Sequence, residues 1–145
     1  MKRVVLDNLN PDELSRLLDE SNQGVILHPK GNSMLPFIRQ GRDKVALGRP
    51  VNLKKGDIVL AWLKGRYFLH RVYALDGEKI TLMGDGNLHG TECGTTADVK
   101  AVVTEIITKE GRGRKPRKAW LWRHTLCLRK YQMKVYRKWH KLMNS

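Results

Sequence analysis

Three polar side chains in this sequence have the types that a hydrolytic site requires: Ser33, His70 and Asp85. A serine hydroxyl needs a base before it can attack a carbonyl group, and an imidazole base needs a partner that fixes its tautomer. The chain order carries no information by itself, because such triads occur in several orders. The residue types predict a nucleophile at Ser33, a general base at His70 and an orienting carboxylate at Asp85.

Each of the three residues also has a purely structural explanation. Ser33 could cap a helix, since a serine side chain accepts a backbone N–H there. His70 could be a buried histidine held by a backbone carbonyl. Asp85 could simply shape a turn, because aspartate often folds back on its own backbone. Asn87 and Glu92 are further candidates for the carboxylate's task of orienting the histidine.

The position of His70 within a strand-like segment favours a role inside the domain. The segment 67–75 alternates, so successive side chains lie on opposite faces of a sheet. One face carries His70 with apolar neighbours, namely Phe68, Val72 and Ala74. The other face carries Tyr67, Leu69, Arg71 and Tyr73. The pattern predicts that His70 points inward.

One helix and a series of strands are expected to position these residues. Asn10-Pro11-Asp12-Glu13 has the features of a helix start, and Gly24 could end that helix. Strand-like runs punctuated by glycine follow at 25–27, 44–47, 57–63, 67–75, 79–83 and 99–107. Lys64-Gly65-Arg66 and Asp76-Gly77 are predicted hairpin turns. We therefore expect a mainly β (α+β) domain.

Residues 25–107 resemble the serine peptidase superfamily that joins type I signal peptidases with LexA-like self-cleaving repressors. Ser33-Met34-x-Pro36 resembles the nucleophile box, and Gly56-Asp57-Ile58-Val59 resembles the strand that follows it. His70-Arg71-Val72 stands where bacterial signal peptidases carry a catalytic lysine. This histidine, together with Gly84-Asp85-Gly86-Asn87, is similar to the archaeal and endoplasmic-reticulum signal peptidases.

The resemblance implies a signal-peptidase/LexA-like β-domain with serine endopeptidase activity on a precursor or leader peptide. It implies an oxyanion site from the Ser33 amide with a donor from Gly31 or Asn32, and a small pocket lined by Met34. Substrate would bind extended along a free strand edge, such as that at 25–28. Signal peptidases of this kind usually carry a membrane anchor, yet no stretch approaches the roughly 20 apolar residues that span a bilayer. Nor do residues 1–10 resemble a secretory signal, since Asp7, Asn8 and Asn10 interrupt any apolar run.

The net charge of +14 is concentrated in the last quarter of the chain. Residues 111–145 hold twelve of the 28 Lys and Arg residues and no Asp or Glu. This segregation predicts a helical segment at 1–24, a peptidase-like domain at 25–110 and a basic tail at 111–145. Residues 111–116, rich in glycine with a proline, are expected to form a flexible linker.

Residues 119–143 of the tail have the periodicity of one amphipathic helix. Its expected apolar side carries Leu121, Leu128, Tyr131, Val135, Tyr136, Trp139, Leu142 and Met143. A basic amphipathic helix with tryptophans suits an anionic membrane surface. Packing of the helix on the domain is an equal alternative, and a nucleic-acid contact ranks below both. We expect a cytoplasmic protein with a peripheral membrane contact as one option.

A different functional class remains open: a non-catalytic or regulatory LexA-like domain that binds peptide, or binds nucleic acid through its basic tail. Against DNA binding, a single N-terminal helix is not a helix-turn-helix. The two cysteines, Cys93 and Cys127, show neither disulfide-scaffold nor metal-ligand spacing, so we expect no metal and no cofactor. The expected partner is a protein or peptide substrate.

Overall fold

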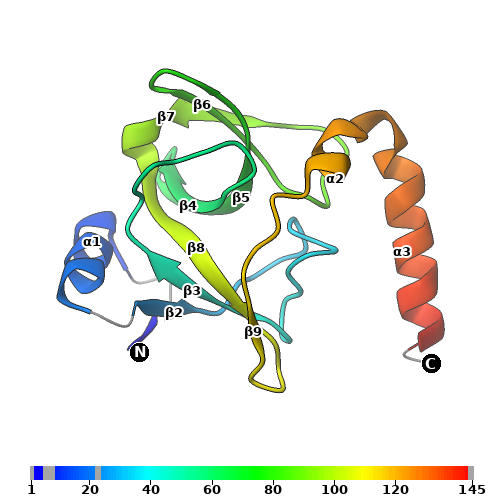
Figure 1. The fold of residues 1–145 in the computed structure, drawn as a ribbon, viewed down its shortest axis with the longest axis horizontal. Helices are drawn as coiled ribbons and strands as arrows, with labels where there is room; N and C mark the ends of the chain where they lie inside the picture. Colours follow the sequence, from blue (N-terminus) through cyan, green and yellow to red (C-terminus); the bar gives the residue numbers. More distant parts are fainter. Residues whose placement is uncertain (1, 5–8, 22–23, 144–145) are drawn as a thin grey trace.

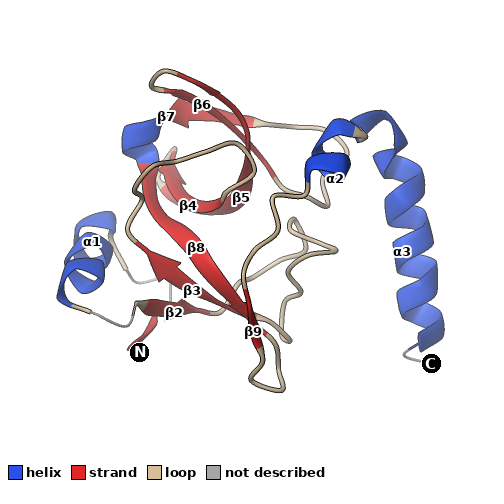
Figure 2. Cartoon of the chain, viewed as in Figure 1, coloured by secondary structure: helices blue, strands red, loops and turns tan. Residues whose placement is uncertain are grey.

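The computed structural model describes residues 2–4, 9–21 and 24–143. Within these residues one sheet dominates the molecule (Figures 1 and 2). Its strands are β1 (Lys2–Val4), β2 (Val25–Leu27), β3 (Lys44–Gly48), β4 (Ile58–Leu63), β5 (Arg66–Asp76), β6 (Lys79–Met83), β7 (Glu92–Thr95), β8 (Val99–Ile107) and β9 (Gly113–Arg114). The helices are α1 (Pro11–Glu20), α2 (Trp120–His124) and α3 (Arg129–Met143), with short 3-10 turns at Thr96–Asp98 and Leu126–Leu128. The predicted mainly β fold, with an N-terminal and a C-terminal helix, is confirmed.

The strand order is β1-β2-β3-β8-β4-β5-β6-β7, and β9 adds to β8. Neighbouring strands are antiparallel except β1 and β2, which are parallel. The sheet is strongly curved, so β4 and β5 coil around one end while β3 and β8 cross the middle (Figure 1). β5 lies between β4 and β6, and it carries His70 into the interior of this curve.

α1 begins where the sequence predicts, because the Asn10 side chain accepts the Glu13 N–H at 2.8 Å. Its apolar face buries Leu14 and Leu18 against one of two hydrophobic clusters of the sheet. The helix ends at Glu20, with Ser21 as its cap, rather than at Gly24. Asp7 and Asn8 lie outside the described residues.

The expected flexible linker at 111–116 is wrong, because part of it returns to the sheet. β9 pairs with the end of β8, with Arg114 opposite Ile106. Two backbone hydrogen bonds, between Thr108 N–H and Arg112 O and between Gly111 N–H and Thr108 O, close the hairpin at 2.8 and 2.9 Å. The glycine-rich composition that suggested a linker instead forms a hairpin turn, with Gly111 at φ +83°.

The tail forms two helices rather than one continuous helix. The chain leaves helical geometry at Thr125 (φ −114°, ψ 38°), whose hydroxyl donates back to the Leu121 carbonyl at 2.9 Å. A side-chain hydroxyl that bonds the preceding turn competes with helix continuation, which explains the break. In the described part of the chain, none of the helices combines the length and hydropathy that crossing a bilayer demands.

Candidate active site

Ser33 lies in a tight turn between β2 and β3 that is anchored from below. Met34 and Ile38 point into the core, and the Met34 carbonyl accepts the amides of Phe37 and Ile38, both at 3.0 Å. Gly31 precedes the turn at φ +83°, a conformation that glycine adopts without strain. The turn therefore holds the Ser33 side chain at a fixed place above the core.

His70 reaches Ser33 from β5. Its Nε2 atom lies 3.2 Å from the Ser33 hydroxyl oxygen, although 37 residues separate them in sequence. The ring is 5% exposed, so the predicted inward orientation is confirmed. A hydroxyl at this distance from an imidazole nitrogen can donate its proton to that nitrogen.

Glu92, the first residue of β7, lies on the other side of the imidazole. Its Oε2 atom is 2.7 Å from His70 Nδ1. A carboxylate can only accept, so this contact places the proton of the neutral ring on Nδ1 and leaves the Nε2 lone pair facing Ser33. Ser33, His70 and Glu92 thus form a continuous hydrogen-bonded series with the polarity of a serine–histidine–carboxylate triad.

Asp85 does not make the expected contact with His70; its carboxylate is held by Arg71. The Arg71 Nε donates to both oxygens at 2.8 and 3.0 Å, and Nη2 donates to Oδ2 at 2.7 Å. Both side chains are fully buried. Burial raises the pKa of the Asp85 carboxyl, while the hydrogen bonds from Arg71 oppose that rise. Asp85 therefore belongs to a buried ion pair behind the site, and Glu92 occupies the position expected of Asp85.

The loop after β6 packs directly on the nucleophile turn through its glycines. The Gly86 N–H donates to the Ser33 carbonyl at 2.8 Å. A side chain at Gly84 would strike the Ser33 carbonyl and come within 2.9 Å of the Ser33 Cβ. The glycines are thus required by close approach, and Asp85 between them faces away toward Arg71.

A cleft of about 310 Å³ opens over this constellation. It is lined by Pro29, Lys30, Gly31, Ser33, Met34, Ile38, Arg66, Tyr67, Phe68, Leu69, His70, Asn87 and Glu92. Polar and apolar side chains share its lining. Burial, followed by the nearby Glu13, raises the pKa of Tyr67 to about 12. Within the described residues, no group of three or more His, Cys, Asp or Glu side chains forms a metal site.

The residues expected to bind the oxyanion differ in whether their donors are available. The Gly31 amide already donates to the Gln40 side chain at 2.8 Å. Asn32 accepts the Leu35 amide through its carbonyl at 3.2 Å, a bond that does not use its own donors. Met34 is buried and lines the cleft, as expected. In the described part of the chain, the Ser33 amide donates to no protein acceptor.

The substrate edge expected at 25–28 is not free, because β2 pairs with β1 on one side and β3 on the other. A different edge is open beside the site. β5 pairs with β4 from Arg66 onward, whereas its pairing with β6 begins only at Arg71. Among the described strands, none covers the second edge of residues 66–70, and these residues line the cleft.

The curved sheet and the segments around Ser33 and His70 define a domain of the LexA-like and signal-peptidase superfamily. The family model described as Peptidase S24-like matches residues 7–103. The match covers more than half of the chain and includes Ser33, His70 and Glu92, so the protein belongs to the Peptidase S24-like family. A search of curated proteins found no match to this chain.

The sequence alone does not reveal the roles of two residues of the site, Glu92 and Arg71. Glu92 was a weaker candidate because its segment, Thr91 to Thr95, lacks the apolar alternation of a strand. The sequence places Arg71 on the face opposite His70 and gives it no role, yet Arg71 is fully buried. The available signal is Gly90 (φ +86°), which lies just before the segment that pairs with β6.

Proposed function

We propose that this protein is a serine endopeptidase that cleaves a peptide bond in a protein or peptide precursor. The observation that carries the proposal is the series Ser33 Oγ, His70 Nε2, His70 Nδ1, Glu92 Oε2, with distances of 3.2 and 2.7 Å, at the floor of a cleft. Membership of a peptidase family supports the reaction class.

In the proposed reaction, His70 Nε2 accepts the hydroxyl proton as Ser33 Oγ bonds to the carbonyl carbon of the scissile peptide. The negative charge moves onto the carbonyl oxygen, where the Ser33 amide is available as a donor. The imidazolium then gives its proton to the leaving nitrogen as the C–N bond breaks, leaving an ester on Ser33. Water, deprotonated by the same nitrogen, then attacks the ester carbon. The bond between that carbon and Ser33 Oγ breaks, Nε2 returns the proton to Oγ, and the new carboxylic acid leaves.

Glu92 acts through the histidine rather than on the substrate. It holds the Nδ1–H tautomer and stabilises the imidazolium that forms in each half-reaction. The substrate lies extended along the open edge of residues 66–70, so its main chain pairs with β5 and its side chains alternate between the cleft and solvent.

Labelling with a fluorophosphonate probe tests the nucleophile. The wild-type protein should be phosphonylated on Ser33, and Ser33→Ala should lose labelling and peptide cleavage together, whereas Ser15→Ala, on the exposed side of α1, should retain both. Cleavage that persists in Ser33→Ala would overturn the assignment. Peptide binding without any labelling of wild type would favour the non-catalytic alternative.

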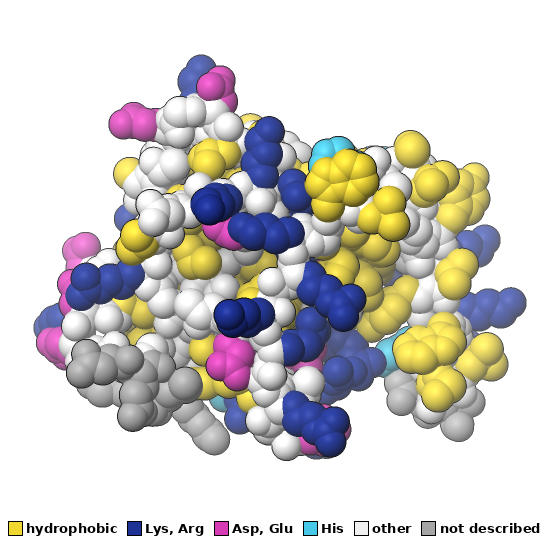
Figure 3. Space-filling view, in the orientation of Figure 1, with side chains coloured by type: hydrophobic (Ala, Val, Ile, Leu, Met, Phe, Trp, Pro, Cys, Tyr) yellow, Lys and Arg dark blue, Asp and Glu magenta, His cyan; other side chains and the backbone are white. Residues whose placement is uncertain are grey.

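We also propose that the tail docks on an anionic membrane surface. The outer side of α3 exposes Tyr131, Val135, Trp139 and Leu142 to 66, 67, 56 and 66%. A row of exposed lysines at 130, 134, 138 and 141 runs beside this apolar row, one residue earlier at every step. Figure 3 shows the yellow apolar side chains gathered over α2 and α3 with blue basic side chains beside them.

The charge and the apolar row point to the same occupant. Each basic side chain near an anionic lipid surface contributes about 1 kcal/mol, and burial of the apolar row adds a salt-resistant component. A hollow of about 330 Å³ lined by Lys55, Tyr73, Trp120, Arg123 and His124 continues this basic and aromatic surface beside α2. The opposite side of α3 is packed, since Arg129 and Met133 are buried.

Vesicle sedimentation of the full chain tests the membrane contact. Val135→Asp should weaken binding to anionic vesicles by roughly tenfold, because a charge would enter the interface. Val51→Asp is a matched control, since Val51 is as exposed (66%) but lies far from the tail in sequence. Equal loss in both variants would contradict the proposal, and stronger binding to DNA than to vesicles would favour the regulatory alternative.

A further inference from the structure

The loop that supports Ser33 is held from outside by the tail. The family match ends at residue 103, yet residues 117–129 supply hydrogen bonds to the segment 84–87. We propose that residues 117–129 are a positioning element for the nucleophile, with Arg129 as its principal residue. The effect on catalysis rests on the proposed peptidase function, whereas the effect on the loop does not.

The loop 84–87 contacts the nucleophile turn directly. Gly86 N–H donates to the Ser33 carbonyl at 2.8 Å, and Asn87 N–H closes the loop on the Gly84 carbonyl at 3.0 Å. Because Gly84 also lies against Ser33, any shift of this loop changes the place of the Ser33 backbone. The hydroxyl would then move relative to His70 Nε2, and a displacement of about 1 Å can lower a rate by about a hundredfold.

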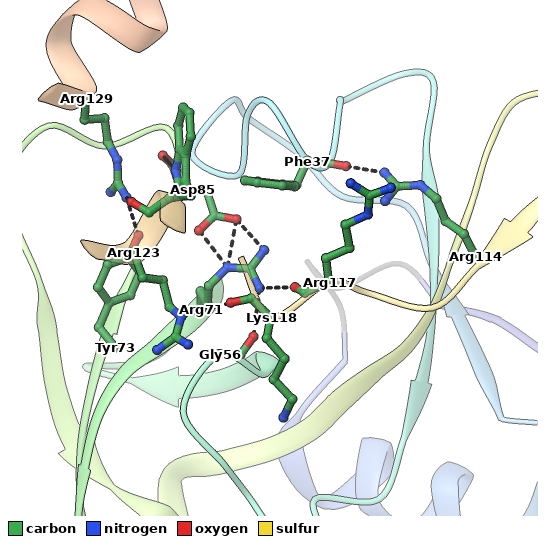
Figure 4. A network of polar contacts seen from close by, with 11 residues as sticks. Phe37, Gly56, Arg71, Tyr73, Asp85, Arg114, Arg117, Lys118, Arg123 and Arg129 are labelled. Atoms are coloured by element: carbon green, nitrogen blue, oxygen red, sulfur yellow. Dashed lines mark hydrogen bonds and ion pairs between the residues drawn. The ribbon is translucent and has the colours of Figure 1, made fainter. Parts of the chain in front are cut away.

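Residues 117–129 of the tail contact the same loop from the outside. The indole N–H of Trp122 donates to the Asp85 carbonyl at 2.8 Å. Arg129 Nη1 donates to the Asn87 carbonyl at 3.3 Å. Arg71, which grips the Asp85 carboxylate, donates through Nη1 to the Arg117 carbonyl at 2.6 Å (Figure 4). The tail therefore contacts this loop at the Asp85 and Asn87 carbonyls directly, and at the Asp85 carboxylate through Arg71.

Trp122 also links the tail to the nucleophile turn itself. Its ring meets Phe37 edge to face, with centroids 5.7 Å apart. Phe37 follows Ser33 by four residues and lies in the same anchored turn. One tail side chain thus contacts both segments whose relative position sets the Ser33 geometry.

Arg129 is fully buried, and its partners are mostly neutral. Its guanidinium donates to the Trp122 carbonyl at 2.9 Å and to the Tyr73 hydroxyl, and it lies 5.2 and 5.5 Å from the Trp122 and Tyr73 ring centres. Within the described residues, no carboxylate forms an ion pair with it. Burying the Arg129 cation costs free energy, and a methionine could fill the same space without that cost. What Arg129 supplies and a methionine cannot is a set of directed hydrogen bonds.

The test compares Arg129→Gln with Arg137→Gln, an exposed position on the same helix, in the full-length protein. Hydrogen exchange reports the loop directly. The Gly86 amide should exchange about tenfold faster in Arg129→Gln, because a buried donor that fixes the loop is lost, while amides of β8 should keep their protection. Arg137→Gln should exchange like wild type.

Kinetics report the nucleophile separately. Acylation of Ser33 and kcat should fall about tenfold in Arg129→Gln, with KM changed less than threefold, and Arg129→Lys should recover part of the rate. If Arg129→Gln does not fold, Trp122→Phe carries the test, since it keeps an aromatic ring beside Phe37 but loses the indole N–H together with the five-membered ring that carries it. It should show the same pattern at about threefold.

Two outcomes separate the failures. Wild-type protein that is never acylated contradicts the peptidase function, while the exchange of Gly86 still tests the positioning. Folded Arg129→Gln and Trp122→Phe with wild-type exchange at Gly86 and wild-type acylation would overturn the inference, because the tail would then be packed on the loop without positioning it.

Discussion

His70 and Arg71 are neighbours on β5, and each side chain meets a carboxylate, yet the two pairs are opposite in character. The His70–Glu92 pair borders the cleft, with Glu92 23% exposed, and joins the Ser33 hydroxyl. The Arg71–Asp85 pair is fully buried, and Arg71 also donates to the Gly56 and Arg117 carbonyls. Because successive residues of a strand face opposite sides, one dipeptide serves a reactive site and its support at the same time.

Position in the fold, rather than residue type, decides which of the two carboxylates can support catalysis. A base that must gain and lose a proton needs a partner whose contact can adjust to both charge states, in a place that substrate and water can reach. A guanidinium never loses its charge, so its carboxylate can be enclosed permanently. Asp85 has the stronger sequence context, but only Glu92 has the geometry.

The largest effect is expected from His70→Ala. Removal of the base should lower kcat/KM by about a thousandfold or more, because His70 Nε2 is the only basic group within hydrogen-bond distance of the Ser33 hydroxyl among the described residues. The melting temperature should change little compared with substitutions of the Arg71 pair. Peptide cleavage and differential scanning calorimetry measure the two quantities. Activity close to wild type would mean that another base operates.

The next largest effect is expected in stability from Asp85→Asn. It leaves the buried Arg71 guanidinium without its charge partner, and breaking such a pair costs about 3 to 5 kcal/mol of unfolding free energy. Urea denaturation measures this loss. The double substitution Arg71→Met and Asp85→Leu should recover most of the stability, since a buried ion pair replaced by apolar side chains is often neutral.

The opposite assignment, in which Asp85 serves His70 and Glu92 does not, predicts a different result. Asp85→Asn that keeps the wild-type unfolding free energy but loses activity would make Asp85, rather than Glu92, the partner of His70. The double substitution separates the cases further, because it removes the Asp85 carboxylate without leaving a buried charge.

The sequence predicts the position of His70 but not the burial of Arg71. Alternation in residues 67–75 places His70 inward, and the turn around Ser33 and the glycine punctuation are visible as local patterns. Burial of Arg71 is not visible, because its cover comes from the tail, with the Arg117 carbonyl 46 residues downstream. β7 was missed for a similar reason: its residues alternate between half-buried and exposed, and pairing with β6 rather than apolar content makes it a strand.

A smaller effect on activity is expected from Glu92→Gln. Glutamine keeps the size but loses the charge that stabilises the imidazolium, so kcat should fall about ten- to a hundredfold with KM and unfolding free energy nearly unchanged.

The melting temperature, measured beside kcat and KM, distinguishes this positioning role from a structural one. A merely structural role for Glu92 would lower the melting temperature of Glu92→Gln, whereas the positioning role lowers kcat and leaves the melting temperature unchanged. Glu92→Asp is the conservative control, because it keeps the charge but shortens the reach to Nδ1, and it should recover part of the lost rate.

The smallest effect is expected from Lys118→Ala, which removes a third ion pair of the same neighbourhood. Lys118 Nζ lies 2.7 Å from Asp57 Oδ1, the same distance as Arg71 from Asp85, but the lysine side chain is 53% exposed. Exposed pairs contribute about 0.2 to 1 kcal/mol, because water and salt screen them. Urea denaturation at low and high salt should therefore show a small loss that shrinks with salt, whereas the loss in Asp85→Asn should persist. A loss of several kcal/mol in Lys118→Ala would show that distance rather than burial decides the strength of these pairs.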